Sequence, residues 1–480
     1  MRDTITINQG WRFHLGECEQ AGYKGYDDTG WQTVCLPHDW SVTQPFDRAC
    51  ASGTGYLPGG VGWYRKRFTL PQDVANRRVF LTFGGVYQNS RVWVNSYYLG
   101  NRPYGYSSFT YEITDRVSPG ENVLCVRAEH LKLADSRWFT GAGIYRDVTL
   151  TLTEQGCFLP DGVFVRTLCA DESEAELRVS AQTDWVDEMR AALLDAQGRP
   201  VASAQGLPQG VTLRVPKPRL WDCRTPALYT LQCEALRQGR AQDCVRIPVG
   251  IRTFRFDADQ GFFLNGEPTK LKGVCLHHDA GALGAAVPPV VWQRRLEKLK
   301  AAGCNAIRFS HNPPDPALLD LCDRMGLLAI DEAFDEWEGC KNKWWQGHNV
   351  YPPKHYGYAD DFPAWHEQDL AAMVRRDRNH PCVILWSIGN EVDYPNDPYV
   401  HEAFQTMVGN NDANKPAAEL QYDPNKPHAR RLTAVARELA AIVRRWDDTR
   451  PVSAALACPE VSNRIGLPET LDVVGYNYKE

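Results

Sequence analysis

The sequence predicts a multidomain protein in which a two-sheet β-sandwich and an immunoglobulin-like β-sandwich precede a (β/α)8 TIM barrel with about six of its eight strands. Residues 1–154 and 155–250 consist of short alternating runs between turns, which is typical of β-sandwiches. In residues 251–480, short buried runs alternate with longer amphipathic runs, which indicates parallel βα units. A chain of 480 residues also exceeds what one hydrophobic core usually serves.

The two predicted sandwiches differ in aromatic content. In the first, runs such as RVFLTFGG (78–85) and SRVWVNSYYLG (90–100) fit a two-sheet sandwich. We expect most of its tryptophans to lie in the core rather than on a sugar-stacking surface; they include Trp31, Trp40, Trp63, Trp93 and Trp138. Residues 155–250, with the Pro-rich stretch VPKPRLWDCRTP (215–226), fit a small immunoglobulin-like sandwich that serves as a scaffold.

The third region contains six candidate strands, namely 270–278, 306–311, 327–337, 383–392, 451–456 and 471–479. Amphipathic stretches such as VVWQRRLEKLKAAG (290–303) and ARRLTAVARELAAIVRRW (429–446) separate them and predict helices. Polar residues gather after each strand, on the face where such barrels carry their active sites.

Composition excludes several classes of partner. A net charge of −6 provides no basic surface for nucleic acid or an anionic membrane. No apolar run approaches the roughly 18 residues of a membrane span, and the N-terminus shows no secretion signal. The fifteen cysteines are scattered without a C-x-x-C pair, which favours reduced thiols in a cytoplasmic protein. The composition is compatible with a homo-oligomer.

The residues that follow the predicted strands should converge on one rim of the barrel. They are His277, His278, Asp279, Arg308, Ser310, His311, Asp331, Glu332, Asp335, Glu336, Asn390, Glu391, Asn477, Tyr478 and Glu480. Carboxylates, imidazoles and amides bind hydroxyl groups, and Trp faces stack on a pyranose, so the set suits a sugar. Any single residue could instead cap a strand end. We expect Asp331 and Glu332, which follow the third strand, to orient polar groups rather than to act as nucleophiles.

Glu391 is the strongest catalytic candidate. It ends the stretch RNHPCVILWSIGNE (378–391), directly after a buried strand. Glycoside hydrolysis needs a carboxylic acid of raised pKa that protonates the leaving oxygen. The buried strand and Asn390 could supply the apolar pocket and an orienting bond. The alternative is that Asn390 and Glu391 only end a strand.

These stretches resemble glycoside hydrolase family 2, the family of β-galactosidases, β-glucuronidases and β-mannosidases. RNHPCVILWSIGNEV (378–392) is similar to its acid/base motif, and GCNAIRFSHNPPDPALLDLCDRMGLLAIDEAFDEW (303–337) is similar to a second signature. LPHDW (36–40), VGWYRKRF (61–68) and SRWFTGAGIYRDV (136–148) resemble its N-terminal jelly roll. The resemblance covers the whole chain.

The resemblance implies a retaining mechanism in which Glu391 is the acid/base and Asn390 is a sugar-binding amide. It places His277 and His311 at positions that line the sugar site. Further predicted substrate-binding residues are Arg308, which would shape the rim, Tyr478, which matches a tyrosine beside the nucleophile, Asp331, and Asp135, which would come from the jelly roll.

The sequence departs from the family pattern at its end. The family's nucleophilic glutamate follows strand seven, whereas this sequence stops after strand six. We therefore expect the nucleophile beyond residue 480, in a longer enzyme, and no normal retaining activity from these residues alone. Glu480 lies one strand too early to replace it. The alternative is a naturally short carbohydrate-binding protein that does not hydrolyse sugar.

The resemblance to bacterial members favours β-galactosides as substrates, with β-glucuronides or galacturonides as the rival class. The loop 342–358, with Trp344, Trp345, His348, Lys354 and His355, could shape the aglycone pocket or form an interface or lid. Some larger family members hold Mg²⁺ near the acid/base, and Glu336 and Glu338 lie near those positions. A matching histidine is absent, so we predict no metal and no other cofactor.

Overall fold

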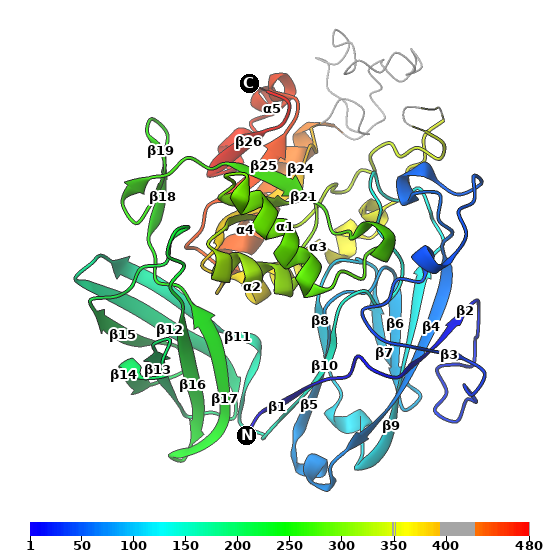
Figure 1. The fold of residues 1–480 in the computed structure, drawn as a ribbon, viewed down its shortest axis with the longest axis horizontal. Helices are drawn as coiled ribbons and strands as arrows, with labels where there is room; N and C mark the ends of the chain where they lie inside the picture. The colour runs from blue at the N-terminus through cyan, green and yellow to red at the C-terminus, as the bar shows by residue number, and fades with distance from the viewer. Residues whose placement is uncertain (348–349, 351, 394–427, 480) are drawn as a thin grey trace.

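The computed structural model describes residues 1–347, 350, 352–393 and 428–479 (Figure 1). Two antiparallel sandwiches come first in the chain, and a curved, parallel six-stranded sheet with helices follows. The predicted fold class is therefore confirmed, including the number of barrel strands in the described residues. No helix in these described ranges is long and apolar enough to cross a membrane.

The jelly roll packs a six-stranded sheet, in the order β3-β2-β4-β9-β6-β7, against a four-stranded sheet, in the order β1-β10-β5-β8. Its strands are β1 (Asp3–Thr6), β2 (Trp11–Leu15), β3 (Gln32–Val34), β4 (Gly60–Leu70), β5 (Arg78–Phe83), β6 (Ser90–Val94), β7 (Tyr97–Arg102), β8 (Phe109–Glu112), β9 (Gly120–His130) and β10 (Val148–Thr153). Trp40 and Trp63 are buried, as expected for core residues. Trp138 lies outside this core, at the candidate site.

The middle sandwich has a three-stranded sheet, β11-β12-β15, and a four-stranded sheet, β14-β13-β16-β17. Its strands are β11 (Cys157–Ala170), β12 (Glu174–Asp184), β13 (Glu188–Leu194), β14 (Pro200–Gly206), β15 (Val211–Pro216), β16 (Tyr229–Arg237) and β17 (Arg240–Val249). Strict alternation along β15 buries Val211, Leu213 and Val215 and exposes the residues between them, as one solvated face requires.

A small sheet of β18 (Phe254–Asp257), β19 (Gly261–Leu264) and β20 (Glu267–Pro268) leads into the barrel. The barrel strands are β21 (Gly273–Leu276), β22 (Ala306–Phe309), β23 (Leu328–Glu332), β24 (Val383–Asn390), β25 (Val452–Leu456) and β26 (Val473–Tyr476), paired in parallel and in chain order. Its described helices are α1 (Pro289–Ala301), α2 (Pro316–Met325), α3 (Phe362–Asp377), α4 (Arg430–Trp446) and α5 (Pro459–Ile465).

The central strand β24 explains why the site forms where it does. All eight of its residues are buried, because parallel strands are covered on both faces. Gly389 allows the indole of Trp337 to pack directly on the strand, since a Cβ there would lie 2.8 Å from that ring. The strand register shifts between Ser387 and Asn390, which delivers Asn390 and Glu391 to the rim.

The jelly roll contacts the barrel at the carboxyl ends of its strands. The Tyr104 hydroxyl donates a hydrogen bond of 2.6 Å to the carbonyl of Ala333, just after β23. Arg146 Nη2 donates to the carbonyl of Pro313, after β22, at 2.9 Å. These contacts bring the loop between β7 and β8 and the loop between β9 and β10 to the rim where the candidate residues lie.

Candidate active site

A buried carboxylate, Glu332 at the end of β23, organises one side of the rim. It accepts hydrogen bonds from Arg308 Nε (2.9 Å) and Nη2 (2.8 Å) and from Ser387 Oγ (2.6 Å). His311 Nδ1 lies 2.6 Å from its other oxygen. Burial raises the pKa of Glu332, but the charge of Arg308 and the contacts with His311 and Ser387 together outweigh it, so the pKa lies below its ordinary value. Glu332 thus stays ionised and fixes Arg308 and His311.

The side chain of Asn390 connects this group to a second carboxylate. Its Nδ2 donates to Asp335 Oδ1 at 2.8 Å, and its Oδ1 accepts from Arg308 Nη2 at 2.8 Å. The ammonium of Lys341 donates to Asp335 Oδ1 (3.1 Å) and to the Asn390 carbonyl (2.6 Å). Asn390 is fully buried in this network. Its predicted contact with sugar stays a prediction.

Glu391 lies beside Asn390 in a strained backbone conformation, with φ of 47°. Its backbone N–H donates to the carbonyl of Ala455 at 2.6 Å, which holds that conformation. Oε1 accepts a 2.8 Å hydrogen bond from Asn477 Nδ2, and Oε2 lies 3.5 Å from Arg137 Nη1. Only 3% of the residue is exposed.

The expected rise in the pKa of Glu391 is wrong for the described residues. Burial raises the pKa of Glu391. A hydrogen bond from Tyr478 and the charges of Lys341 and Arg137 lower it by more than burial raises it, so the net shift is downward. The reason is that cations and donors surround the carboxylate. A second, unpaired carboxylate close to it would shift the pKa back upward.

An aromatic group adjoins the Glu332 network through His311. The rings of His277 and His311 lie 5.3 Å apart, and Trp138 lies 5.1 Å and 5.5 Å from them. Burial lowers the pKa of His277 to about 4, and the charge of His311 adds to this effect. His277 is therefore neutral at physiological pH. Its Nδ1 has no hydrogen-bond partner among the described residues.

Asp135, from the jelly roll, also reaches this region. Its Oδ2 accepts hydrogen bonds from the Tyr87 hydroxyl (2.8 Å) and Gln88 Nε2 (2.6 Å). Its Oδ1 is buried and has no partner in the described part of the chain. Asp135 lines a pocket between the jelly roll and the barrel, together with Tyr87, Tyr104, Tyr106, Trp138, His311, Asp335 and Glu336.

Asp331 does not join this cluster, which corrects its predicted role. Because side chains alternate along β23, Glu332 faces the rim network and Asp331 faces the opposite side. Asp331 is fully buried, and neither of its oxygens accepts a hydrogen bond from the described residues. Burial and the nearby charge of Asp377 raise its pKa well above the usual range. We therefore exclude Asp331 from the candidate site.

Replacement of Asp331 by asparagine is expected to stabilise the protein at neutral pH by about 1.4 kcal/mol or more, the free energy of one pKa unit, because asparagine has no charge to bury. Because the folded-state pKa of Asp331 is raised, its contribution to stability is fully present below the unfolded-state pKa. That contribution is lost as the pH rises through the folded-state pKa. The gain should therefore vanish in acid. Urea unfolding of both proteins from pH 4 to 8 measures it, and an equal difference at every pH would contradict the assignment.

The remaining predicted residues divide between the rim and other places. Tyr478 bonds Glu391 from the end of β26 and is 77% exposed. His278 lies away from the rim, with its Nε2 3.0 Å from the carbonyl of Ala285. In the loop 342–358, Trp345 donates its indole N–H to the carbonyl of Ala49 in the jelly roll (2.9 Å), so part of this loop forms a domain contact. His348 and Glu480 lie outside the described residues.

The two glutamates considered for Mg²⁺ are both bound to cations of the protein. Glu336 accepts hydrogen bonds from Lys343 Nζ and from the backbone N–H of Lys341. Glu338 forms an ion pair with Arg431. Each carboxylate already has its counter-charge, so these residues do not fit a Mg²⁺ site and we assign no catalytic step to a metal.

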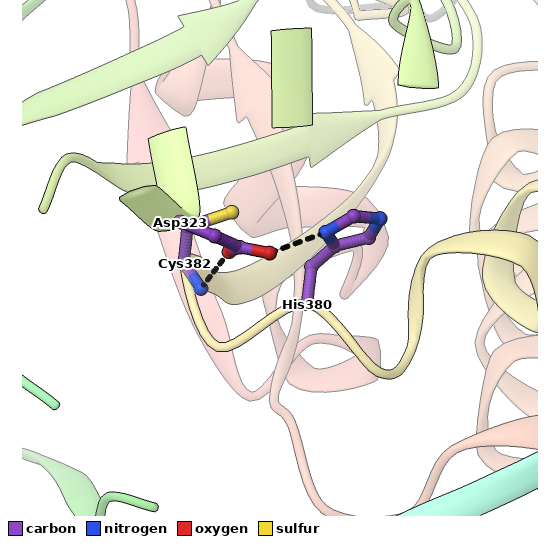
Figure 2. A group of neighbouring side chains, drawn as sticks. All are labelled: Asp323, His380 and Cys382. Atoms are coloured by element: carbon purple, nitrogen blue, oxygen red, sulfur yellow. Dashed lines mark hydrogen bonds and ion pairs between the residues drawn. The ribbon is translucent and has the colours of Figure 1, made fainter. Parts of the chain in front are cut away.

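Figure 2 shows a second group of possible metal ligands, formed by Asp323 of α2 with His380 and Cys382 near the start of β24. Asp323 accepts the backbone N–H of Cys382 at 3.0 Å and lies 2.6 Å from His380 Nδ1. The Cys382 thiol donates to the carbonyl of Leu319, and burial raises its pKa well above the usual range. These bonds tie α2 to the start of β24, which indicates a structural role.

Sequence reasoning missed two cations of the candidate site. Arg137 of the jelly roll contacts Asp335 (2.9 Å) and Glu391, and Lys341 contacts Asp335 and the Asn390 carbonyl. The motif SRWFTGAGIYRDV contains Arg137, but nothing in it indicates a carboxylate almost 200 positions away. Lys341 lies in a loop without recognisable periodicity.

The carboxyl rim of the parallel strands thus carries carboxylates, imidazoles and amides, and a tryptophan of the jelly roll lies beside them, which is where TIM barrels place their active sites. The chain belongs to glycosyl hydrolases family 2. Residues 257–466 match the TIM barrel domain of that family, residues 7–154 match its sugar binding domain, and residues 161–252 match a third region of glycosyl hydrolases family 2.

The relatives include a curated protein named Beta-galactosidase BoGH2A, from Bacteroides ovatus, which is 41% identical over 99% of this chain and 57% of its own length. A beta-glucuronidase of Bacteroides fragilis is 29% identical over 82% of this chain and 56% of its own length. The crystal structure of a family 2 member from Bacteroides cellulosilyticus superposes with a TM-score of 0.84, at 35% identity, over 99% of this chain and 58% of that one. The chain thus spans less than two thirds of these proteins.

Proposed function

We propose that this chain forms part of a retaining exo-β-glycosidase that removes terminal sugars from β-glycosides or oligosaccharides. The observation that carries the proposal is Glu391, a buried carboxylate held at the barrel rim beside Asn390. Two buried polar atoms without partners among the described residues, Asp135 Oδ1 and His277 Nδ1, suit sugar hydroxyl groups.

In this reaction Glu391 protonates the leaving oxygen and then activates water. A second carboxylate about 5–5.5 Å away acts as nucleophile, and we propose that it lies outside the 480 residues, after strand seven. Its charge would raise the pKa of Glu391, which the nearby cations otherwise lower.

We propose β-galactosides as the substrates, because a relative named as a β-galactosidase is 41% identical over almost the whole chain. β-Glucuronides are the second candidate class, since other relatives are named β-glucuronidases.

The test assays the full-length gene product that contains this sequence with nitrophenyl β-galactoside, β-glucuronide, β-galacturonide and β-mannoside. We expect cleavage of the galactoside, with the β-anomer of galactose as the first product by NMR. Faster cleavage of the glucuronide than of the galactoside would make β-glucuronides the substrate class in place of β-galactosides. Sugar binding without cleavage of any glycoside would instead identify a non-hydrolytic carbohydrate-binding protein and refute the proposal.

A further inference from the structure

The loop between β9 and β10 brings a cation from the jelly roll to the barrel rim. Arg137 Nη2 lies 2.9 Å from Asp335 Oδ1, and its Nη1 lies 3.5 Å from Glu391 Oε2. The side chains of the two acids are 8% and 4% exposed, whereas that of Arg137 is 30% exposed. One guanidinium thus bridges two buried carboxylates of the barrel.

We propose that Arg137 is a positioning residue that orients the Glu391 carboxylate at the rim through the guanidinium it shares with Asp335. The inference rests on the proposed function, because it concerns the residue assigned there as acid/base. Arg137 acts through Glu391, and nothing in the geometry requires it to touch the substrate.

The planar guanidinium suits this role because its donors have fixed directions. One arm is anchored on Asp335, which Asn390 and Lys341 also hold, so the other arm has a defined place beside Glu391. A lysine could supply the charge but not two directed contacts.

The charges around Glu391 come from several elements. Lys341 and Asp335 follow β23, and Asn477 and Tyr478 follow β26. Glu332, Arg308 and His311 form the neighbouring group on β22 and β23. The positive charges of Arg137 and Lys341 balance the negative charges of Asp335 and Glu391. Loss of Arg137 therefore leaves one negative charge in excess. Glu391 should then take up a proton more readily.

The test compares Arg137→Met, which removes the charge, and Arg137→Lys, which keeps it, with Lys132→Met as the matched control. Lys132 lies on the same loop and pairs with the exposed Asp360, away from Glu391. The Glu391 carboxyl is titrated by ¹³C NMR in the full-length product labelled at glutamate, and its signal is identified by its loss in Glu391→Gln.

We expect Arg137→Met to raise the pKa of Glu391 by about one unit. Arg137→Lys should raise it less, and Lys132→Met should leave it unchanged. Should Arg137→Met fail to fold, Arg137→Gln removes the charge while keeping a polar contact, and the same shift is expected. The proposal is overturned if the pKa of Glu391 in the variant without the Arg137 charge equals the pKa in Lys132→Met.

Kinetics of the full-length product provide the second readout. A general acid must be protonated in the first step, so the basic limb of the kcat/KM profile reports its pKa. This limb should move to higher pH in Arg137→Met, and kcat should fall more than KM rises in Arg137→Lys. An unmoved limb would overturn the role of Arg137. Absence of all hydrolysis would refute the proposed function instead, while the NMR titration still decides the Arg137 contact.

Discussion

Replacement of Glu391 by glutamine is expected to lower kcat/KM of the full-length product for a nitrophenyl β-galactoside by a factor of about 10²–10⁴, the usual contribution of a general acid. Glutamine keeps the shape and can still contact Asn477, but it has no proton to donate to the leaving oxygen. The loss should therefore depend on the leaving group. A dinitrophenyl galactoside, whose phenolate leaves without protonation, should be cleaved in the first step almost as fast as by the wild type.

The control for this experiment is Glu438→Gln, which alters a carboxylate of α4 that pairs with His366 at the surface. It should leave kcat/KM unchanged for both substrates. An equal loss for the two leaving groups in Glu391→Gln would show that Glu391 does not act as the acid, and full activity would remove it from the mechanism.

Replacement of Glu332 by glutamine is expected to have the largest effect on stability, a loss of about 3–5 kcal/mol in the free energy of unfolding. The change removes the buried negative charge that pairs with Arg308. It also replaces the carboxylate beside His311 by an amide. Urea unfolding at neutral pH measures this loss.

The pH dependence of that loss follows from the pKa of Glu332. Because the folded-state pKa is depressed, its contribution is fully present above the unfolded value of about 4.3 and disappears as pH falls through the folded value. The difference between wild type and Glu332→Gln should therefore narrow in acid. Glu338→Gln, which breaks a partly exposed pair with Arg431, is the control and should change stability by no more than about 1 kcal/mol.

The sequence was sufficient to predict the fold class, because periodicity is a local signal. Runs with period two indicated the sandwiches, and the continuous apolar run of β24 indicated a strand buried on both faces. The same local signal placed Glu391 and His311 at strand ends, on one rim.

The choice between Asp331 and Glu332 could not be made in this way. A strand covered on both faces shows no alternation between polar and apolar residues, so its sequence does not reveal which of two neighbouring acids points to the rim. Arg137 escaped prediction for a different reason. Its partner Asp335 lies on another domain, and such contacts depend on how the two domains pack rather than on any nearby residue.

The contact between Tyr104 and Ala333 joins residues 229 positions apart, which has a consequence for synthesis on the ribosome. At roughly 5–20 residues per second, the jelly roll leaves the exit tunnel about 9–36 seconds before the segment that ends β23. The N-terminal domain can therefore be folded already when the barrel emerges. The barrel rim would then fold against a preformed surface of the jelly roll, on which the Tyr104 hydroxyl is already in place to bind the carbonyl of Ala333.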